Sequence, residues 1–212
     1  MKRNIVIATV AAVALIGGGT ATALAVTGDD ESSAAAKKSS VQLKDDHRDD
    51  AKENSAEVKA AKVTAADAIK AALANQSGTA VSAELDDEDN GGLIWDIDIL
   101  GKGDTWHSVQ VDPGTGKVLG SHTEQDEDGD ASRVSAALKD ASTTAGDAAK
   151  AAAAKGTVTS VDLDDDGTAA AWDAETVASG GTESDWHVDL RSAAVSPDRG
   201  DSAGHDDSAQ DD

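Results

Sequence analysis

The sequence predicts an α+β fold in which a small antiparallel sheet is covered by one N-terminal helix, present as two tandem units flanked by disordered acidic segments. Three observations predict this fold. Residues 93–111 alternate apolar and polar side chains with a period of two, as strands with one buried face do. A helical pattern with a capping residue precedes this stretch. The same order of features returns about 80 residues later, which indicates an internal duplication.

A hairpin forms the centre of the first unit. In its first strand, Trp95, Ile97 and Ile99 alternate with aspartates, and the apolar positions of its second strand alternate with polar ones in the same way over residues 107–112. Residues 101–104 connect the two strands and contain two glycines, which can take the positive φ angles that short hairpin connections need. A sheet that is apolar on one face requires a cover.

A second turn extends this hairpin into a meander. Residues 112–116 have the sequence DPGTG, in which proline fixes φ and glycine can occupy the left-handed region. The chain therefore reverses here, and a further short strand begins at Lys117.

The cover is a helix that begins at Thr64. The Thr64 hydroxyl precedes the Asp67 carboxylate by three residues, as in a capping box. The apolar side chains that follow lie on one side of a helix: Ala65, Ala66, Ile69, Ala72 and Leu73. Residues 79–85 then alternate as a first strand, and an acidic turn leads into the hairpin.

The second unit repeats this order with fewer aliphatic side chains. Residues 144–152 match residues 64–72, Trp172 matches Trp95, and the pair Trp186-His187 matches Trp106-His107. Alanine replaces Ile69 and Leu73, and the proline-glycine turn is missing. Each lost aliphatic side chain removes about 1.5–3 kcal/mol of burial, so we expect the second unit to be less stable.

The N-terminus predicts export. Residues 1–4 are basic, Ile5–Ile16 is an apolar run interrupted only by Thr9, and Ala23-Leu24-Ala25 is a small-x-small cleavage site. The alternative is an uncleaved membrane anchor, because Ile5–Val26 is long enough to span a bilayer. No cysteine follows the apolar run, which excludes a bacterial lipoprotein.

These patterns divide the chain into six segments. We expect a signal peptide at 1–25, a disordered linker at 26–61, unit 1 at 62–123, an acidic linker at 124–134, a degenerate unit 2 at 135–197, and a disordered acidic tail at 198–212.

The capped helix at residues 64–69, the aromatic-led strand at residues 95–99 and the turn motif at residues 109–119 resemble the PepSY domain. The resemblance is clear over residues 62–119 and weak over residues 142–195. It implies a secreted bacterial PepSY-domain protein with a small α+β module that has no catalytic residues of its own. The family is proposed to restrain peptidases, so the resemblance implies a peptidase modulator.

The composition of the chain limits the classes of partner that it is expected to bind. The net charge is −23, which makes nucleic acid and anionic membrane surfaces poor partners and favours cations, basic peptides or basic protein surfaces. A membrane partner is expected only if the N-terminal segment stays uncleaved. No catalytic serine or zinc-protease motif is present, and we expect neither enzymatic activity nor a cofactor.

Two groups of residues are candidate metal sites. Asp162, Asp164 and Asp166 precede Gly167 with the spacing of a calcium loop, and Asp173 stands at the twelfth position in place of glutamate. A solvated acidic turn is the interpretation that we favour, and calcium is the alternative. A metal pair of His107 and His187 is a further alternative to two half-buried strand histidines.

Two hypotheses of function follow. The first is a secreted or envelope-associated interaction module that modulates or inhibits an extracellular peptidase. The second is an acidic cation-binding, for example calcium-binding, or spacer protein of the cell envelope.

Overall fold

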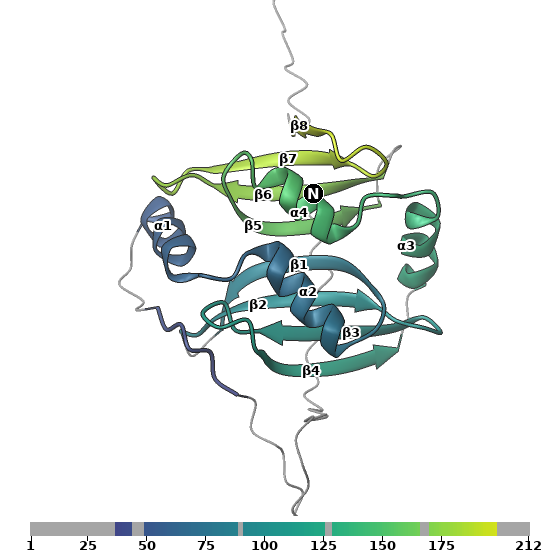
Figure 1. Cartoon of the computed structure of the whole chain (residues 1–212), viewed down its shortest axis with the longest axis horizontal. Coiled ribbons are helices and arrows are strands. Elements are labelled where there is room, and N and C mark those ends of the chain that lie inside the picture. The colour runs from purple at the N-terminus through teal and green to yellow at the C-terminus, as the bar shows by residue number, and fades with distance from the viewer. Residues whose placement is uncertain (1–36, 44–48, 89–90, 126–128, 166–169, 199–212) are drawn as a thin grey trace, which may run out of the picture.

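The computed structural model describes residues 37–43, 49–88, 91–125, 129–165 and 170–198, and these residues contain one eight-stranded antiparallel sheet. The strands lie in the order β4-β3-β2-β1-β5-β6-β7-β8 (Figure 1). The predicted α+β class with two helix-and-hairpin units is confirmed. What the sequence did not predict is that the two units share a single sheet.

Unit 1 is a helix followed by a four-stranded meander. Its elements are α2 (Ala65–Asn75), β1 (Thr79–Asp87), β2 (Leu93–Leu100), β3 (Thr105–Val111) and β4 (Val118–Gln125). Unit 2 repeats them as α4 (Ala145–Ala152), β5 (Thr157–Asp164), β6 (Ala171–Val177), β7 (Glu183–Asp189) and β8 (Val195–Pro197).

The two helices begin in the same way. The Thr64 Oγ1 atom accepts a hydrogen bond from the Asp67 backbone N–H at 3.2 Å and donates to the Asp67 carboxylate at 2.8 Å. Thr144 and Asp147 repeat both bonds at the same distances. The hydroxyl satisfies a backbone donor that has no partner inside the helix, which explains why each helix begins at this threonine.

Helices α2 and α4 lie side by side across one face of the sheet, which we call the helix face (Figure 1). The core between helices and sheet contains Trp95 and Trp172, which are both almost fully buried. Ile69 of α2 approaches Gly146 of α4, so the two units share one continuous core.

The units join where β1 pairs with β5. Only three residue pairs connect these strands: Ser82 with Asp162, Ala83 with Val161, and Glu84 with Ser160. Ala83 and Val161 are fully buried on the helix face. The other two pairs lie on the opposite face, which we call the outer face.

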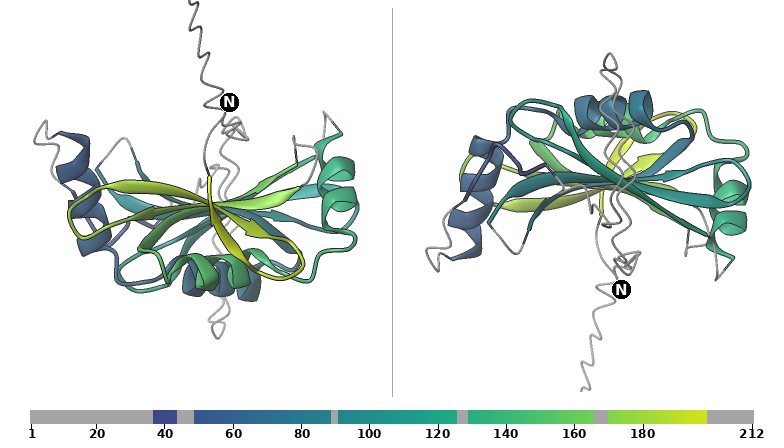
Figure 2. Two further views of the ribbon diagram at one scale, coloured as in Figure 1. Left: turned by 90° about the horizontal axis from the view of Figure 1, so that it is seen from above. Right: turned by 90° about the horizontal axis from the view of Figure 1, so that it is seen from below.

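Two further helices, α1 (Asp50–Ala60) and α3 (Asp130–Leu138), stand at opposite ends of the sheet on the side away from α2 and α4 (Figure 2). α1 precedes unit 1 in the chain but packs on unit 2, where the Ser55 hydroxyl donates to the Ser179 carbonyl. α3 precedes unit 2 but covers Trp106 of unit 1 with Ala131 and Val134. Each unit is therefore held by the helix that precedes the other unit.

Both outer helices correct the predicted linkers. The disordered linker predicted at 26–61 contains α1, which Asp49 caps by accepting from the Lys52 backbone N–H. The acidic linker predicted at 124–134 contains the first half of α3. Ala131, Val134 and Leu138 form an apolar stripe with helical spacing, and this signal was present in the sequence.

The strand register also corrects two predicted equivalences. Trp95 pairs with Val111 and Trp172 pairs with Val188, so these two tryptophans are equivalent. Trp186 pairs with Ala174 and therefore corresponds to Val109, not to Trp106. The expected match of Trp186-His187 with Trp106-His107 is wrong, because the sequence alignment did not account for register.

Among the described residues, no helix has the length and apolar character that crossing a membrane requires. The predicted signal peptide and the acidic tail from residue 199 lie outside those residues.

Candidate interaction surface

Eleven carboxylates of the described strands come from five adjacent strands to the outer face of the sheet. Alternate residues of a strand point to opposite faces, and the apolar residues of each strand occupy the helix face. The acidic residues between them therefore point outward from β2, β1, β5, β6 and β7: Asp96, Asp98, Glu84, Asp86, Asp162, Asp164, Asp173, Glu175, Glu183, Asp185 and Asp189.

Glu84 stands at the centre of this surface. It pairs with Asp96 of β2 on one side and with Ser160 of β5 on the other. Burial, together with the smaller effect of the negative charges of Asp162, Asp86, Asp96 and Glu175, raises the pKa of Glu84 to about 7. Burial also raises the pKa of Asp86. The centre of the outer face therefore takes up protons near neutral pH.

Hydroxyl groups hold several of these carboxylates in place. Ser82 Oγ donates to Asp162 Oδ1 at 2.6 Å, and Ser108 Oγ donates to Asp96 Oδ1 at 2.5 Å. The first bond connects the two units across the seam between β1 and β5. Such bonds stabilise the ionised carboxylate, which is a charge-assisted acceptor.

A histidine lies at the β7 side of the outer face. His187 Nδ1 is 2.6 Å from Asp173 Oδ1, and His187 Nε2 is 3.2 Å from Asp198 Oδ1. Burial lowers the pKa of His187, but the two carboxylates outweigh this effect and the pKa is raised overall. Burial raises the pKa of Asp173 although the histidine opposes the shift. The protonated form of His187 therefore neutralises part of the negative charge at this side of the outer face.

The end of this surface at α1 and the end at α3 differ in charge. On α1, burial and, to a smaller extent, the charges of nearby Glu53 and Asp87 raise the pKa of Glu57 to about 7. On α3, Arg133 bridges to Asp130 at 2.8 Å and to Asp165 at 3.2 Å. The acidic surface thus continues up one side of α1, while α3 places an arginine at the other end.

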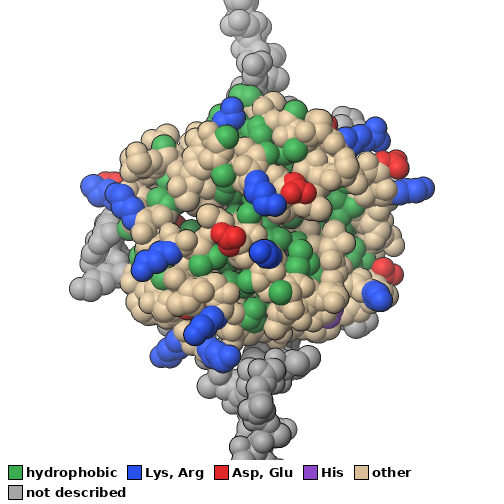
Figure 3. Space-filling model, in the orientation of Figure 1, with side chains coloured by type: hydrophobic (Ala, Val, Ile, Leu, Met, Phe, Trp, Pro, Cys, Tyr) green, Lys and Arg blue, Asp and Glu red, His purple; other side chains and the backbone are tan. Residues whose placement is uncertain are grey.

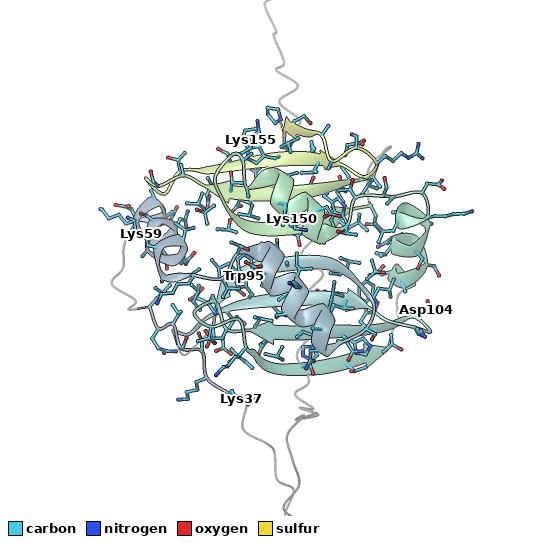
Figure 4. The ribbon with its side chains drawn as sticks, in the orientation of Figure 1. Lys37, Lys59, Trp95, Asp104, Lys150 and Lys155 are labelled. Carbon is cyan, nitrogen blue, oxygen red and sulfur yellow. The ribbon has the colours of Figure 1, made fainter. Side chains whose placement is uncertain are left out.

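The helix face has a different character. Figure 3 shows hydrophobic side chains between separate lysines and arginines on this face, with few acidic groups. Lys150 of α4 points outward from it (Figure 4) and lies 3.3 Å from Asp147. Lys155 stacks over the ring of Trp186 at 5.1 Å. The negative charge of the ordered sheet is therefore concentrated on one face.

The structure places three of the four candidate calcium ligands in strands. Asp162 and Asp164 belong to β5, and Asp173 belongs to β6 opposite Asp162. Asp166 lies outside the described residues. A calcium loop wraps its successive ligands around one ion, whereas an extended strand points them along a line. Over the described ranges no three acidic, histidine or cysteine side chains are grouped as metal ligands.

The two candidate histidine ligands lie on opposite faces. His107 pairs with Ile99 and points to the helix side, where its Nε2 is 3.1 Å from Gln76 Nε2. His187 pairs with Asp173 and points to the outer side. The sheet separates the two imidazoles, so the alternative of a metal pair is wrong.

Sequence reasoning missed the acidic surface itself. It interpreted Asp96 and Asp98 as the wet face of one strand and did not connect them with Asp162 and Asp164 of the other unit. The signal was the pattern Asp-x-Asp in both units, but only the pairing of β1 with β5 brings the two patterns onto one surface.

Residues 62–122 match the family model PepSY, described as "Peptidase propeptide and YPEB domain". This part of the chain is a PepSY domain, and it coincides with unit 1. No curated protein matched the chain. A crystal structure described as that of a "putative lipoprotein" from Clostridium difficile 630 is similar at 22% identity and a TM-score of 0.40; the match covers 64% of this chain and 91% of that one.

Proposed function

We propose that this chain is an exported, non-enzymatic PepSY module that modulates an extracellular peptidase, and that it binds a basic surface of its partner with the outer face of the sheet. The observation that carries the proposal is the match of residues 62–122 to a domain described from peptidase propeptides. Export is supported by the basic start, apolar run and cleavage site of residues 1–25.

The charge of the outer face supports a basic partner. Eleven carboxylates of the described strands lie on five neighbouring strands, and α1 and α3 border them at the two ends (Figure 2). A surface of one charge sign attracts a partner of the opposite sign and accelerates association, and it repels acidic partners. A sheet face of this kind binds by complementarity and needs no catalytic group.

The test measures hydrolysis by secreted peptidases of the source organism in the presence of the purified mature chain. A slower reaction at a stoichiometric ratio is expected, and the effect should weaken as salt is raised because exposed charges are screened. Unchanged hydrolysis across these peptidases would refute the proposed modulation.

Two matched variants assign the effect to the outer face. The double variant Asp98→Asn/Asp164→Asn removes two charges from it, and Asp104→Asn/Asp140→Asn removes two charges from exposed positions elsewhere, of which Asp104 lies in the β2–β3 turn (Figure 4). Only the first variant should reduce modulation. Equal effects of both variants would mean that net charge, not this surface, is responsible.

The second candidate function is cation binding or spacing in the cell envelope, which the concentration of carboxylates on the outer face favours. Divalent ions would then gather on the strands as a diffuse atmosphere.

N-terminal sequencing of the natural protein distinguishes the cleaved form from the membrane-anchored form. A chain that begins after Ala25 has been cleaved, and one that begins at Met1 remains anchored.

A further inference from the structure

A short segment upstream of α1, residues 39–43, is joined to unit 1 by an isolated antiparallel β-bridge between Gln42 and Gly92. It lies where β3 ends and turns away from β2, in the purple part of the chain in Figure 1 that begins at Lys37 in Figure 4. Leu93 N donates to Val41 O at 3.1 Å, and Leu43 N donates to Gly91 O at 2.9 Å. The segment therefore pairs with the backbone at the start of β2 through one isolated β-bridge.

The β3–β4 turn supplies the specific contacts. Ser40 Oγ donates to Asp112 Oδ1 at 2.8 Å, and Ser40 N donates to Asp112 Oδ2 at 3.3 Å. Gly114 N and Thr115 Oγ1 also donate to this carboxylate. Burial raises the pKa of Asp112, but these four bonds outweigh it and the pKa is lowered overall, so the carboxylate stays ionised as an acceptor.

Ser40 is itself exposed, but the residues on either side of its contact with the turn are buried. Asp112 is 4% exposed and Ser39 is 6% exposed. A Cβ atom on Gly114 would clash with Ser40 Oγ and approach Val41 Cγ2 to 3.1 Å. Gly114 does not have a positive φ, so a side chain at this position would act through the segment, by displacing the Ser40 hydroxyl from Asp112.

Unit 2 shows the same turn, and no segment of this kind lies against it among the described residues. Asp189 occupies the position of Asp112 but is exposed, and it accepts from the backbone N–H groups of Arg191 and Ser192 in its own turn. The aspartate alone therefore suffices to close the turn. In unit 1 the additional bonds of Asp112 serve recognition of a second segment.

We propose that the groove between the start of β2 and the Asp112 turn is a binding site for an extended, serine-bearing peptide of a partner protein, and that residues 39–43 occupy it as an internal ligand. Recognition follows the strand-addition mode, in which backbone hydrogen bonds supply affinity and a side-chain contact supplies selectivity. A partner peptide needs a serine that reaches Asp112, followed by a small aliphatic residue at the position of Val41. This site is separate from the outer face and does not depend on the proposed function.

The test uses the full chain and a labelled peptide of sequence KKSSVQL, which copies residues 37–43. The tethered segment competes at an effective concentration on the order of millimolar, so wild type should bind the peptide weakly. The variant Ser40→Ala/Val41→Ala loosens the internal segment and should bind at least about tenfold more tightly. Equal affinity of the two proteins would overturn the proposal.

Further substitutions in the loosened variant locate the binding. Gly114→Ala and Asp112→Asn should each weaken peptide binding at least about tenfold, whereas Gly120→Ala, which has open space around it, and Asp189→Asn should not. Binding that survives Gly114→Ala would place the peptide elsewhere and reject the groove.

Amide exchange provides a readout that does not require the peptide. In Ser40→Ala the amides of Leu43 and Leu93 should exchange at least about tenfold faster, while those of Arg191 and Ser192 stay unchanged. Unchanged exchange at Leu93 would show that Ser40 does not hold the segment and would contradict the proposal.

Discussion

Trp95 and Trp172 make the same hydrogen bond in the two units. Each indole Nε1 donates at 3.0 Å to the backbone carbonyl just before the helix N-cap, Val63 in unit 1 and Thr143 in unit 2. The bond fixes each helix over its meander. This geometry and the threonine helix caps are kept in both units, although unit 2 has lost aliphatic side chains.

We predict that Trp95→Phe and Trp172→Phe destabilise the protein to a similar extent. Each removes the donor for a carbonyl and part of a buried side chain, at a cost of about 2–4 kcal/mol. Urea denaturation measures the free energy of unfolding. Trp186→Phe is the control and should cost less, because that indole is only partly buried and bonds to the Thr176 hydroxyl. A Trp172→Phe effect near zero would contradict the shared role.

The second prediction concerns the contact of α1 with unit 2. Gly181 has φ +86°, and a Cβ atom there would clash with the Ala51 carbonyl of α1. Gly181→Ala should therefore displace α1 and destabilise the protein more than Gly103→Ala, which has φ +70° and open space. The strain of a positive φ is common to both variants and is about 1–2 kcal/mol.

Amide exchange in α1 distinguishes the two effects. Gly181→Ala should accelerate exchange over residues 50–60, and Gly103→Ala should leave these amides protected. Similar protection of α1 in both variants would show that α1 does not depend on this glycine.

The third prediction is that the protein becomes more stable as pH falls from about 7.5 to about 5.5. The folded pKa values of Glu84 and Glu57 are raised to about 7, so the folded state binds more protons than the unfolded state in this interval. The contribution of the two groups to the free energy of unfolding is fully present when both are protonated. It is lost as pH rises through their folded pKa values. The raised pKa of His187 acts in the same direction.

Solvent screening limits the size of this effect. Both glutamates are partly exposed, and each should contribute about 1–2 kcal/mol over the interval. Melting temperatures at several pH values measure it, and Glu84→Gln should flatten the profile. A melting temperature that rises from pH 5.5 to pH 7.5 would contradict the assignment.

The elements of each unit could be predicted from the sequence because their causes are local. Thr64 and Asp67 define the start of α2, and alternation at Trp95, Ile97 and Ile99 defines β2. The family resemblance at unit 1 rests on these residues and is confirmed. The start of α4 follows from the same local pattern.

The assembly of the two units could not be predicted, because it depends on contacts between distant segments. The seam has three residue pairs and no sequence motif. α1 has Val58 as its single branched aliphatic residue, and it is held by caps and by contacts with the turn around Ser179 and Gly181. The acidic outer face follows from the seam and was missed for the same reason.

The fourth prediction concerns calcium. Asp162, Asp164 and Asp173 lie in paired strands, so we expect weak, salt-sensitive binding without a specific stoichiometry. In calorimetry with millimolar calcium, the heat of binding to Asp164→Asn/Asp166→Asn should be close to that of the wild type. Any decrease should be no larger than the removal of two charges explains. A saturable heat that disappears in the double variant would instead establish a calcium loop.

The last prediction concerns the unequal stability of the two units as fragments. Residues 62–123 retain Ile69 over Trp95, Ile97 and Ile99, and we expect them to fold cooperatively. Residues 135–197 start inside α3 and cover Trp172 with alanines alone, because Ile69, which lies against Gly146 in the intact chain, is removed. We therefore expect no cooperative melt by circular dichroism from this fragment.

Mixing the fragments tests whether the missing contacts are the cause. Residues 62–123 offer the β1 edge and the side of α2 that pack on unit 2 in the intact chain. Their addition should therefore restore ordered structure to residues 135–197, seen as a blue shift in tryptophan emission as Trp172 becomes buried. A sharp melt from residues 135–197 alone would show that alanine cover suffices, and the seam would then join two units that are each stable.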